Sequence, residues 1–265
     1  MQERMLKILV TNDDSYTSRG IELVAKMLSR YGHVTVVAPK YPQSGKSVAL
    51  TLDAPLRCSK IGSFTSSCNT TVTTYALTGT PADCVKWAAN FVYTKEKPDL
   101  VVSGINHGSN ASVASLYSGT LRAAAEGAIY GVKAVGLSIN THDPNPDFTQ
   151  IEEYLVEIIG KAIKYPVGEG VYLNINFPAI AKEQIKGIRM ATQGNGMWIK
   201  EFEQRKDPHG RDYYWMTGNF KNNETGRETI ADHILMDEGY ITVVPHRVDT
   251  TCRETLARIQ EDWNL

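Results

Sequence analysis

Hydrophobic positions along this chain follow two periods in turn, and their alternation predicts an α/β fold. Apolar runs suited to buried strands occur at residues 6–11, 34–38, 100–104 and 134–138. Between the first two runs, Ile21, Val24 and Leu28 recur at helical spacing. Strand, helix and strand in succession form the βαβ unit, which joins parallel strands by a right-handed crossover. We therefore predict a mostly parallel sheet flanked by helices, of the Rossmann-like type.

Turn and cap residues predict where several elements begin and end. Thr80, Pro81 and Asp83 have the pattern of a helix start with a capping box. Gly32 suits a left-handed cap at the end of the first helix. Further strands are predicted at residues 48–57, 71–77 and 171–176, with a Ser/Thr-rich connection between the first two.

The last third of the chain differs in composition from the rest. Residues 187–245 are rich in Gly, Asn, charge and aromatics, with strand-like runs at 212–216 and 240–244, and residues 253–263 look helical. Such a pattern suits long hairpins that protrude from the main sheet, whose Tyr213, Tyr214 and Trp215 would need a partner surface. We therefore divide the chain into an α/β core, 1–186, and a C-terminal extension, 187–265, with a protruding β-hairpin and a terminal helix for oligomerisation.

Composition excludes several classes of function. The formal net charge of the 265-residue chain is −1, which indicates neither a nucleic-acid polymer nor a membrane surface as partner. No apolar run approaches the ~20 residues that a membrane helix needs. The four cysteines are scattered without a CxxC pair, which argues against a zinc knuckle or a disulfide framework: Cys58, Cys68, Cys84 and Cys252. We expect a cytoplasmic protein.

Asn12-Asp13-Asp14 directly follows the first strand and is the first candidate for chemistry. Two adjacent carboxylates repel each other unless a cation lies between them. Ligands also collect at the carboxyl ends of strands in an open α/β sheet. On this stretch alone, a polar turn with a helix cap is as good an explanation as a metal site.

Two more polar loops are predicted at the same edge of the sheet. One carries Gln43 and Ser44 after the second strand, and the other runs from Asn106 to Thr120 after the strand at 100–104. Their oxygen-bearing side chains, with the Asp pair, suit hard cations such as Mg²⁺ or Mn²⁺. Zinc would need a nitrogen or sulfur cluster, which these loops do not offer.

Ser118-Gly119-Thr120 precedes a helix built from small residues. Backbone N–H groups at such a helix start, together with the helix dipole, favour an anion. The Gly-Lys-Ser/Thr ending of a P-loop is missing, so the tripeptide by itself indicates only an anion cradle.

Several motifs then occur in one order over residues 6–140. They are Val10-Thr11-Asn12-Asp13-Asp14, Val37-Ala38-Pro39 with Gln43-Ser44-Gly45, Gly79-Thr80-Pro81-Ala82-Asp83-Cys84, Val102-Ser103-Gly104-Ile105-Asn106-His107-Gly108-Ser109-Asn110, and Tyr117-Ser118-Gly119-Thr120 with Glu126-Gly127. Together they resemble the SurE family, the survival-protein-E 5′/3′-nucleotidases.

The resemblance implies a phosphatase that uses one divalent metal ion, Mg²⁺ or Mn²⁺, to hydrolyse nucleoside monophosphates to nucleoside and phosphate. By motif, the metal ligands would be Asp13, Asp14, Ser44 and Asn106. Asp13 and Asp14 would also be the catalytic residues. The substrate-binding residues would be Asn12, Asn110, Ser118, Gly119 and Thr120. The resemblance further implies a homodimer or homotetramer assembled through C-terminal elements.

The chain departs from the family pattern at two positions beside the site. Ser15 stands where the family usually has Gly after the Asp pair, and Leu121 stands where Val is common. If position 15 needs a positive φ, Ser costs about 1 kcal/mol there. An alternative to the enzyme is a non-catalytic nucleotide- or phosphate-binding protein on the same fold. A receiver-type module is disfavoured, because its phosphoacceptor Asp has no counterpart where the strand ends in Ile105-Asn106.

Overall fold

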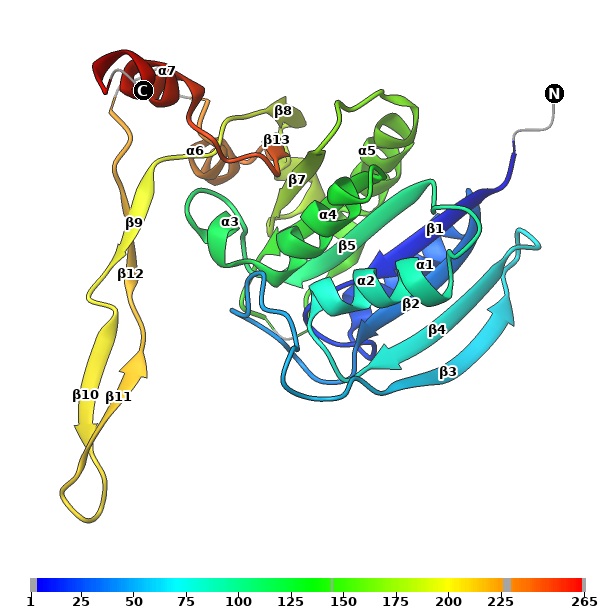
Figure 1. Ribbon diagram of the computed structural model, residues 1–265, viewed down its shortest axis with the longest axis horizontal. Helices are drawn as coiled ribbons and strands as arrows, with labels where there is room; N and C mark the ends of the chain where they lie inside the picture. Colours follow the sequence, from blue (N-terminus) through cyan, green and yellow to red (C-terminus); the bar gives the residue numbers. More distant parts are fainter. Residues whose placement is uncertain (1–3, 144, 226–229, 264–265) are drawn as a thin grey trace.

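The structure is a computed structural model that describes residues 4–143, 145–225 and 230–263. Its centre is a nine-stranded sheet with the order β3-β4-β2-β1-β5-β6-β7-β13-β8 (Figure 1). Its strands are β1 (Leu6–Thr11), β2 (Gly32–Pro39), β3 (Cys58–Thr65), β4 (Thr71–Leu77), β5 (Leu100–His107), β6 (Lys133–Asn140), β7 (Val171–Pro178), β8 (Ile188–Met190) and β13 (Ile241–Arg247). From β4 to β7 all neighbours pair in parallel, whereas β3 and β13 run antiparallel to β4 and β7. The predicted Rossmann-like sheet is confirmed.

Helices cover both faces of this sheet. The larger ones are α1 (Arg19–Leu28), α2 (Pro81–Phe91), α4 (Gly119–Ile129) and α5 (Glu152–Lys164), and the shorter ones are α3 (Ala114–Tyr117), α6 (Asp232–Asp237) and the 3₁₀ turns η1 (Phe148–Gln150) and η2 (Lys182–Gln184). One buried cluster joins α1 and α5 to the sheet, and a second joins α2 and α4 to its other face. A Cβ added to Gly127 of α4 would lie 2.9 Å from Val101 of β5, so this helix of small residues packs close to the sheet.

The strand order places β1 at a topological switch point. β1 pairs with β2 on one side and with β5 on the other, so the connections that leave β1 and β5 diverge. A crevice at such a point is where open α/β sheets bind ligands. The loops that follow β1, β2 and β5 therefore share one edge, as predicted.

Two local predictions are wrong. Residues 48–57 form an irregular segment, and the strand β3 lies in the Ser/Thr-rich stretch that was expected to be a connection. The Thr51 hydroxyl donates to the carboxylate of Asp83, at the start of α2, at 2.7 Å. This segment is therefore attached to the helix and does not pair with the sheet. β3 is an edge strand with polar residues on both faces, so it lacks the alternation by which a half-buried strand is recognised.

Gly32 is the second correction. It begins β2 and is not a left-handed helix cap. A Cβ there would lie 2.0 Å from the carbonyl oxygen of Leu6, so glycine is required by the close approach of β1 and β2. The capping box at Thr80 and Asp83 is present as predicted.

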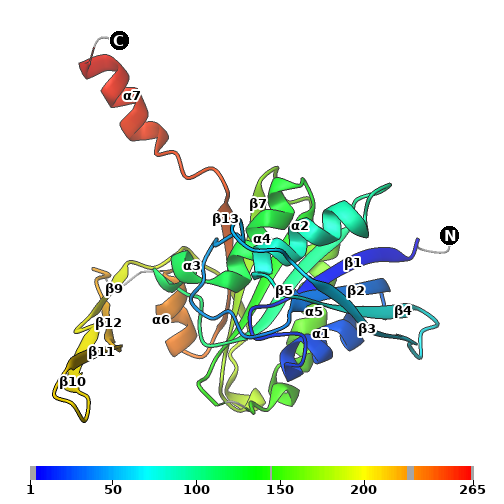
Figure 2. The same cartoon turned by 60° about the horizontal axis from the view of Figure 1, so that its bottom comes forward.

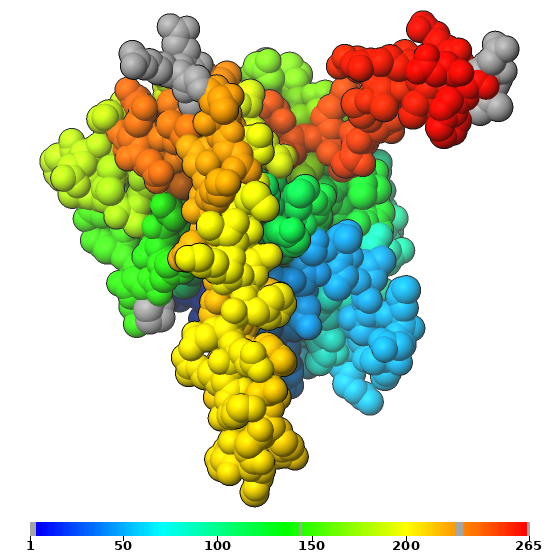
Figure 3. Space-filling view, turned by 90° about the vertical axis from the view of Figure 1, so that its left-hand side faces the viewer, coloured from blue at the N-terminus to red at the C-terminus, as the bar shows by residue number. Residues whose placement is uncertain are grey.

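Two parts of the C-terminal extension project from the core, whereas its strands β8 and β13 belong to the central sheet. Residues 196–222, called the arm here, form a long two-stranded hairpin made of β9 (Gly196–Ile199), β10 (Phe202–Lys206), β11 (Asp212–Met216) and β12 (Asn219–Asn222). The arm leaves the body of the protein (Figures 1 and 3), and α7 (Arg253–Asp262) extends from it in another direction (Figure 2). No described residue of α7 is buried. Across the part of the chain that the structure describes, no helix has the length and apolar character to cross a membrane.

Candidate active site

Asn12, Asp13 and Asp14 lie where β1 ends, in a turn that Asn12 holds in shape. The side-chain nitrogen of Asn12 donates to the carbonyl oxygen of Ser15 and to the hydroxyl of Ser18, both at 2.8 Å. Ser18 is also the N-cap of α1. Ser15 has φ +99°, so the condition under which serine is strained at this position is met. The amide nitrogen of Asn12 is thus used within the turn, while its oxygen has no hydrogen-bond partner among the described residues.

Asp13 is buried against the start of α4. Its carboxylate accepts a hydrogen bond from the Thr120 hydroxyl at 2.5 Å. A Cβ added to Gly119 would lie 3.1 Å from the Asp13 Cβ and 3.3 Å from Oδ2, so only glycine fits there without crowding the carboxylate. The residues predicted as metal ligand and as anion cradle are therefore in contact.

Burial of the two carboxylates makes their negative charge costly without a cation. Desolvation raises the pKa of Asp13 to about 6, opposed by the Thr120 hydrogen bond and reinforced by the neighbouring charge of Asp14. Desolvation also raises the pKa of Asp14, and the backbone amide of His107 partly opposes this. Oδ2 of Asp14 is buried with no hydrogen-bond partner within the described residues.

These observations fit a hard cation. An unpartnered, buried carboxylate oxygen beside a second carboxylate is the donor arrangement that Mg²⁺ or Mn²⁺ prefers. Asn106 is half-buried, and its side-chain nitrogen donates to the Gly108 carbonyl at 2.8 Å, which leaves its oxygen to accept. No cluster of three or more His, Cys, Asp or Glu side chains occurs among the described residues, so hydroxyl and amide oxygens would have to complete the coordination shell.

Ser44 is more exposed than the other predicted ligands. Its loop is attached to the site by its neighbour Gln43, whose backbone N–H donates to the Asp13 carbonyl at 2.7 Å. Ser44 itself is exposed. The structure thus brings the loop to the Asp pair without burying the predicted serine.

The predicted substrate residues divide into two kinds. Ser118 is the N-cap of α4 and accepts from the Leu121 N–H at 3.1 Å, so its hydroxyl closes the helix end. The N–H groups of Gly119 and Thr120, which precede Leu121 in the first turn of α4, lack acceptors within the helix and suit an anion. Asn110 is buried, with its side-chain nitrogen on the Ser138 hydroxyl at 2.7 Å. It is therefore fixed from behind, by β6.

Sequence reasoning missed the residues that hold this loop. Asn176 of β7 accepts from the Asn110 backbone N–H at 2.8 Å, and Asn174 donates to the Asn110 carbonyl at 2.9 Å. Both are fully buried on a strand that otherwise reads as core. Two asparagines spaced by two residues point to the same face of a strand, and that was the available signal.

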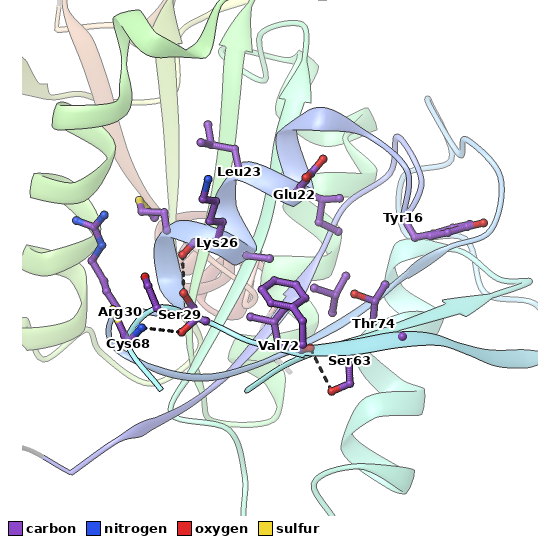
Figure 4. A pocket seen from close by; sticks show the side chains of 18 of the residues that line it. Tyr16, Glu22, Leu23, Lys26, Ser29, Arg30, Ser63, Cys68, Val72 and Thr74 are labelled. Carbon is purple, nitrogen blue, oxygen red and sulfur yellow. Dashed lines mark hydrogen bonds between the residues drawn. The ribbon is translucent and has the colours of Figure 1, made fainter. Parts of the chain in front are cut away.

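A cavity of about 940 Å³ lies elsewhere, between α1 and the β3–β4 hairpin (Figure 4). Lys26, Ser29 and Thr74 are among the residues that line it, and the loop residues Tyr16 to Ser18 form part of its wall. None of the predicted metal or phosphate residues contributes to its lining. The candidate site is therefore the cluster of polar residues at the end of β1, outside this cavity.

Fold and site together define an α/β protein with a candidate site of oxygen donors beside a helix N-terminus. Residues 8–200 match the family model described as survival protein SurE. The chain is 41% identical over 258 residues to the 5′-nucleotidase SurE of Cytophaga hutchinsonii, with 97% of each chain covered. It is also 41% identical over 265 residues to the 5′-nucleotidase SurE of Flavobacterium johnsoniae, covering 100% of this chain and 99% of that one.

A solved structure agrees with these sequence matches. The crystal structure of the SurE protein from Aquifex aeolicus superposes with a TM-score of 0.79 at 33% identity, over 96% of this chain and 98% of that chain. The protein belongs to the SurE family, as the ordered motifs predicted.

Proposed function

We propose that this protein is a metal-dependent 5′-nucleotidase that hydrolyses nucleoside monophosphates to nucleoside and phosphate. The observation that carries the proposal is the contact between the Asp13 carboxylate and the start of α4, with the unpartnered Asp14 oxygen beside it. A cation site and a phosphate cradle would then lie side by side at one edge of the sheet. The names of the relatives described above support the same activity.

The metal would be held by Asp13, Asp14, Ser44 and Asn106, and we propose Mg²⁺ or Mn²⁺. When bound, such an ion supplies Lewis-acid polarisation of a phosphoryl oxygen and lowers the pKa of bound water. The Thr120 hydrogen bond orients one oxygen of Asp13, which leaves the other free to act. Asn106 keeps its nitrogen on the Gly108 carbonyl, so its oxygen is presented in a fixed direction.

The substrate phosphate would lie at the N-terminus of α4, against the residues from Ser118 to Thr120. Their backbone N–H groups and the helix dipole stabilise the charge that develops on the phosphoryl oxygens. Asn110 and Asn12 shape the loops on either side of this position. Because both have side-chain nitrogens committed to protein acceptors, their contribution is to hold those loops in place.

Two chemical routes use the same residues and give different intermediates. In the first, water attacks phosphorus in line and gives one proton to a carboxylate; the bond from phosphorus to the nucleoside oxygen breaks, and that oxygen takes up the proton and leaves as the alcohol. In the second, an Asp13 oxygen attacks phosphorus and displaces the nucleoside oxygen, which takes a proton from water; a second water then hydrolyses the aspartyl-phosphate to phosphate and the free carboxylate. Acid quenching of a reaction with labelled substrate distinguishes them, because label retained on the protein requires the second route.

Phosphate release from adenosine monophosphate, with and without Mn²⁺, tests the proposed activity. We expect release only with the metal, and a panel of 5′ and 3′ nucleotides then defines the preferred base and position. A protein that binds the nucleotide under these conditions and releases no phosphate would be a non-catalytic binding protein.

We further propose that the extension assembles the protein into a homodimer or homotetramer. An isolated two-stranded hairpin is marginally stable in water, and the arm exposes large apolar side chains such as Tyr214, Trp215 and Met216. A cytoplasmic location is part of this proposal. All four cysteines are free, as is usual in a reducing compartment.

A further inference from the structure

The carboxylate of Asp232, the first residue of α6, joins segments that are far apart in the chain. It is fully buried. It accepts the backbone N–H of Ser112 at 3.0 and 3.1 Å, that of Gly194 at 3.0 Å and that of His233 at 2.8 Å. Ser112 belongs to the loop between β5 and α3, and Gly194 lies just before the arm. One side chain therefore connects the loop from Asn110 to Ser118, called the site loop here, to the segment at Gly194 from which the arm begins.

This junction depends on the charge and shape of one carboxylate. Among the described residues, the basic group found within ion-pair distance of Asp232 is the ring of His233, at 3.6 Å, and that ring makes no hydrogen bond within the same residues. The backbone N–H groups are thus the donors that offset the burial of the charge. Without the carboxylate, the N–H groups of Ser112 and Gly194 would be left buried without acceptors.

The loop after β5 is held at two nearby positions, Asn110 and Ser112, by side chains from other elements. Asn110 is fixed by β6 and β7, and two residues later Ser112 is fixed by Asp232. The Ser112 hydroxyl also donates to the Gly194 carbonyl at 2.9 Å. Ser112 has φ +53°, an unfavourable conformation for a residue with a side chain, so it needs such contacts to persist.

From Ser112 the connection continues toward the phosphate position. The Ser115 hydroxyl of α3 donates to the Ser112 carbonyl at 2.8 Å, and α3 leads directly to Ser118, the N-cap of α4. Asp232 touches neither the Asp pair nor the predicted cradle in any contact described above. It acts on them through the loop.

We propose that Asp232 is a positioning residue that holds the loop from Asn110 to Ser118 against the base of the arm, so that loop and arm move as one unit. A displaced arm then changes the affinity of the site for the substrate phosphate. This inference deepens the proposed nucleotidase function and rests on it. It adds a residue from outside the predicted site and a route by which the extension affects catalysis.

Asp232→Asn keeps the shape of the side chain and one acceptor oxygen, but it removes the charge and the second oxygen, which accepts from Ser112 at 3.1 Å. Asp237→Asn, at an exposed position on the same helix, is the matched control. We expect the Asp232 variant to raise KM for adenosine monophosphate about tenfold while kcat changes less than about threefold, since misplaced binding groups lose their alignment. The control keeps both constants. A folded Asp232→Asn protein with unchanged KM overturns the inference.

Hydrogen exchange in the metal-free protein provides a readout that does not depend on activity. Asp232→Asn is expected to accelerate exchange in peptides that cover residues 108–117 and 192–196, and to leave residues 6–14 of β1 and its turn unchanged. Acceleration spread evenly over the whole core would mean that Asp232 serves general stability, and would also contradict the proposed role.

A second pair of variants changes residues beside Asp232 on the arm side. It tests the same coupling if Asp232→Asn does not fold. A Cβ at Gly194 would lie 2.1 Å from Nδ1 of His233, so Gly194→Ala should displace the arm base and raise KM. Adding His233→Ala opens that space and should restore KM toward the wild-type value. Equal KM in wild type, single and double variants overturns the coupling.

The controls separate this inference from the proposed function. If wild-type protein with Mn²⁺ releases no phosphate, the nucleotidase proposal fails, and the exchange experiment still reports on the junction. If wild type is active and Asp232→Asn matches it in KM and exchange, only the role of Asp232 fails.

Discussion

The site loops and the arm differ in how their side chains are satisfied: the loops bury polar groups, and the arm exposes apolar ones. In the loop after β5, the buried Asn110 finds hydrogen-bond partners on other elements of the same chain, Asn176 of β7 and Ser138 of β6. On the arm, aromatic side chains such as Tyr214 and Trp215 are more than half exposed, at 59% and 57%. The chain therefore fixes the loop after β5 by its own contacts, whereas it leaves the aromatic side chains of the arm exposed.

The difference indicates what each region still requires. At the end of β1, the unsatisfied groups among the described residues include a carboxylate oxygen of Asp14, which a cation would satisfy. On the arm, the unsatisfied surface is apolar and extended, which another protein surface would satisfy. Asp232 lies where the two regions meet, and it links them through backbone N–H groups.

The largest expected effect comes from a substitution in the candidate site. Asp13→Asn removes a proposed metal ligand while keeping the side-chain shape and a possible contact with Thr120. We expect phosphate release from adenosine monophosphate with Mn²⁺ to fall by about 10³-fold or more, because charge stabilisation in the transition state is lost. Asp53→Asn, at an exposed position, is the control. Near-normal turnover in the Asp13 variant would refute the assignment.

A pair of truncations contrasts the core with the arm. Leu137→Ala, at a fully buried position in β6, should lower the free energy of unfolding by about 2–5 kcal/mol at any protein concentration. Trp215→Ala on the arm should lower the unfolding midpoint only at concentrations where the wild type is assembled, and should shift sedimentation toward smaller species. Chemical denaturation at two concentrations measures both. A Trp215 variant that sediments like wild type would remove the arm from the proposed interface.

The pH dependence of the metal-free protein sharpens the account of the Asp pair. The folded pKa of Asp13, about 6, is above its ordinary value of 3.8, so the native state binds more protons than the unfolded state between these values. Stability should therefore fall as pH rises from about 4 to 6, by roughly 2–3 kcal/mol. The difference in unfolding free energy between wild type and Asp13→Asn across this range isolates the effect. A difference that is flat with pH would contradict it.

The smallest expected effect concerns the turn after the Asp pair. Ser15→Gly relieves a positive φ and should stabilise the protein by about 1 kcal/mol, less whatever the contact between the Ser15 and Thr17 hydroxyls contributes. Thermal unfolding of the two proteins measures the change. A clear loss of stability would mean that this hydroxyl contact outweighs the backbone strain.

Prediction from sequence succeeded where a residue pattern acts locally. The helical spacing of Ile21, Val24 and Leu28 and the capping box at Thr80 are confirmed because each depends on neighbours in the chain. The strand at 212–216 is confirmed for the same reason, and the family membership followed from several motifs in order.

Prediction failed where distant segments decide the structure. Glycine is required at position 32 by the close approach of β1, and not by the end of the preceding helix. Residues 48–57 are held by Asp83 and have no strand partner. Asp232 carried no recognisable signal, because its partners Ser112 and Gly194 lie 120 and 38 residues away in the chain. The assignment of metal and substrate residues, and the boundary between core and extension at residue 186, stay predictions.

The central claim is that the Asp13–Asp14 pair anchors a metal that the reaction requires. Titration of Mn²⁺ into chelator-treated protein, followed by phosphate release from adenosine monophosphate, tests it most directly. The account predicts no release without metal, recovery that saturates with one equivalent of bound Mn²⁺, and no recovery in an Asp14→Asn variant. Full release by the chelator-treated protein, or equal recovery in that variant, would contradict it.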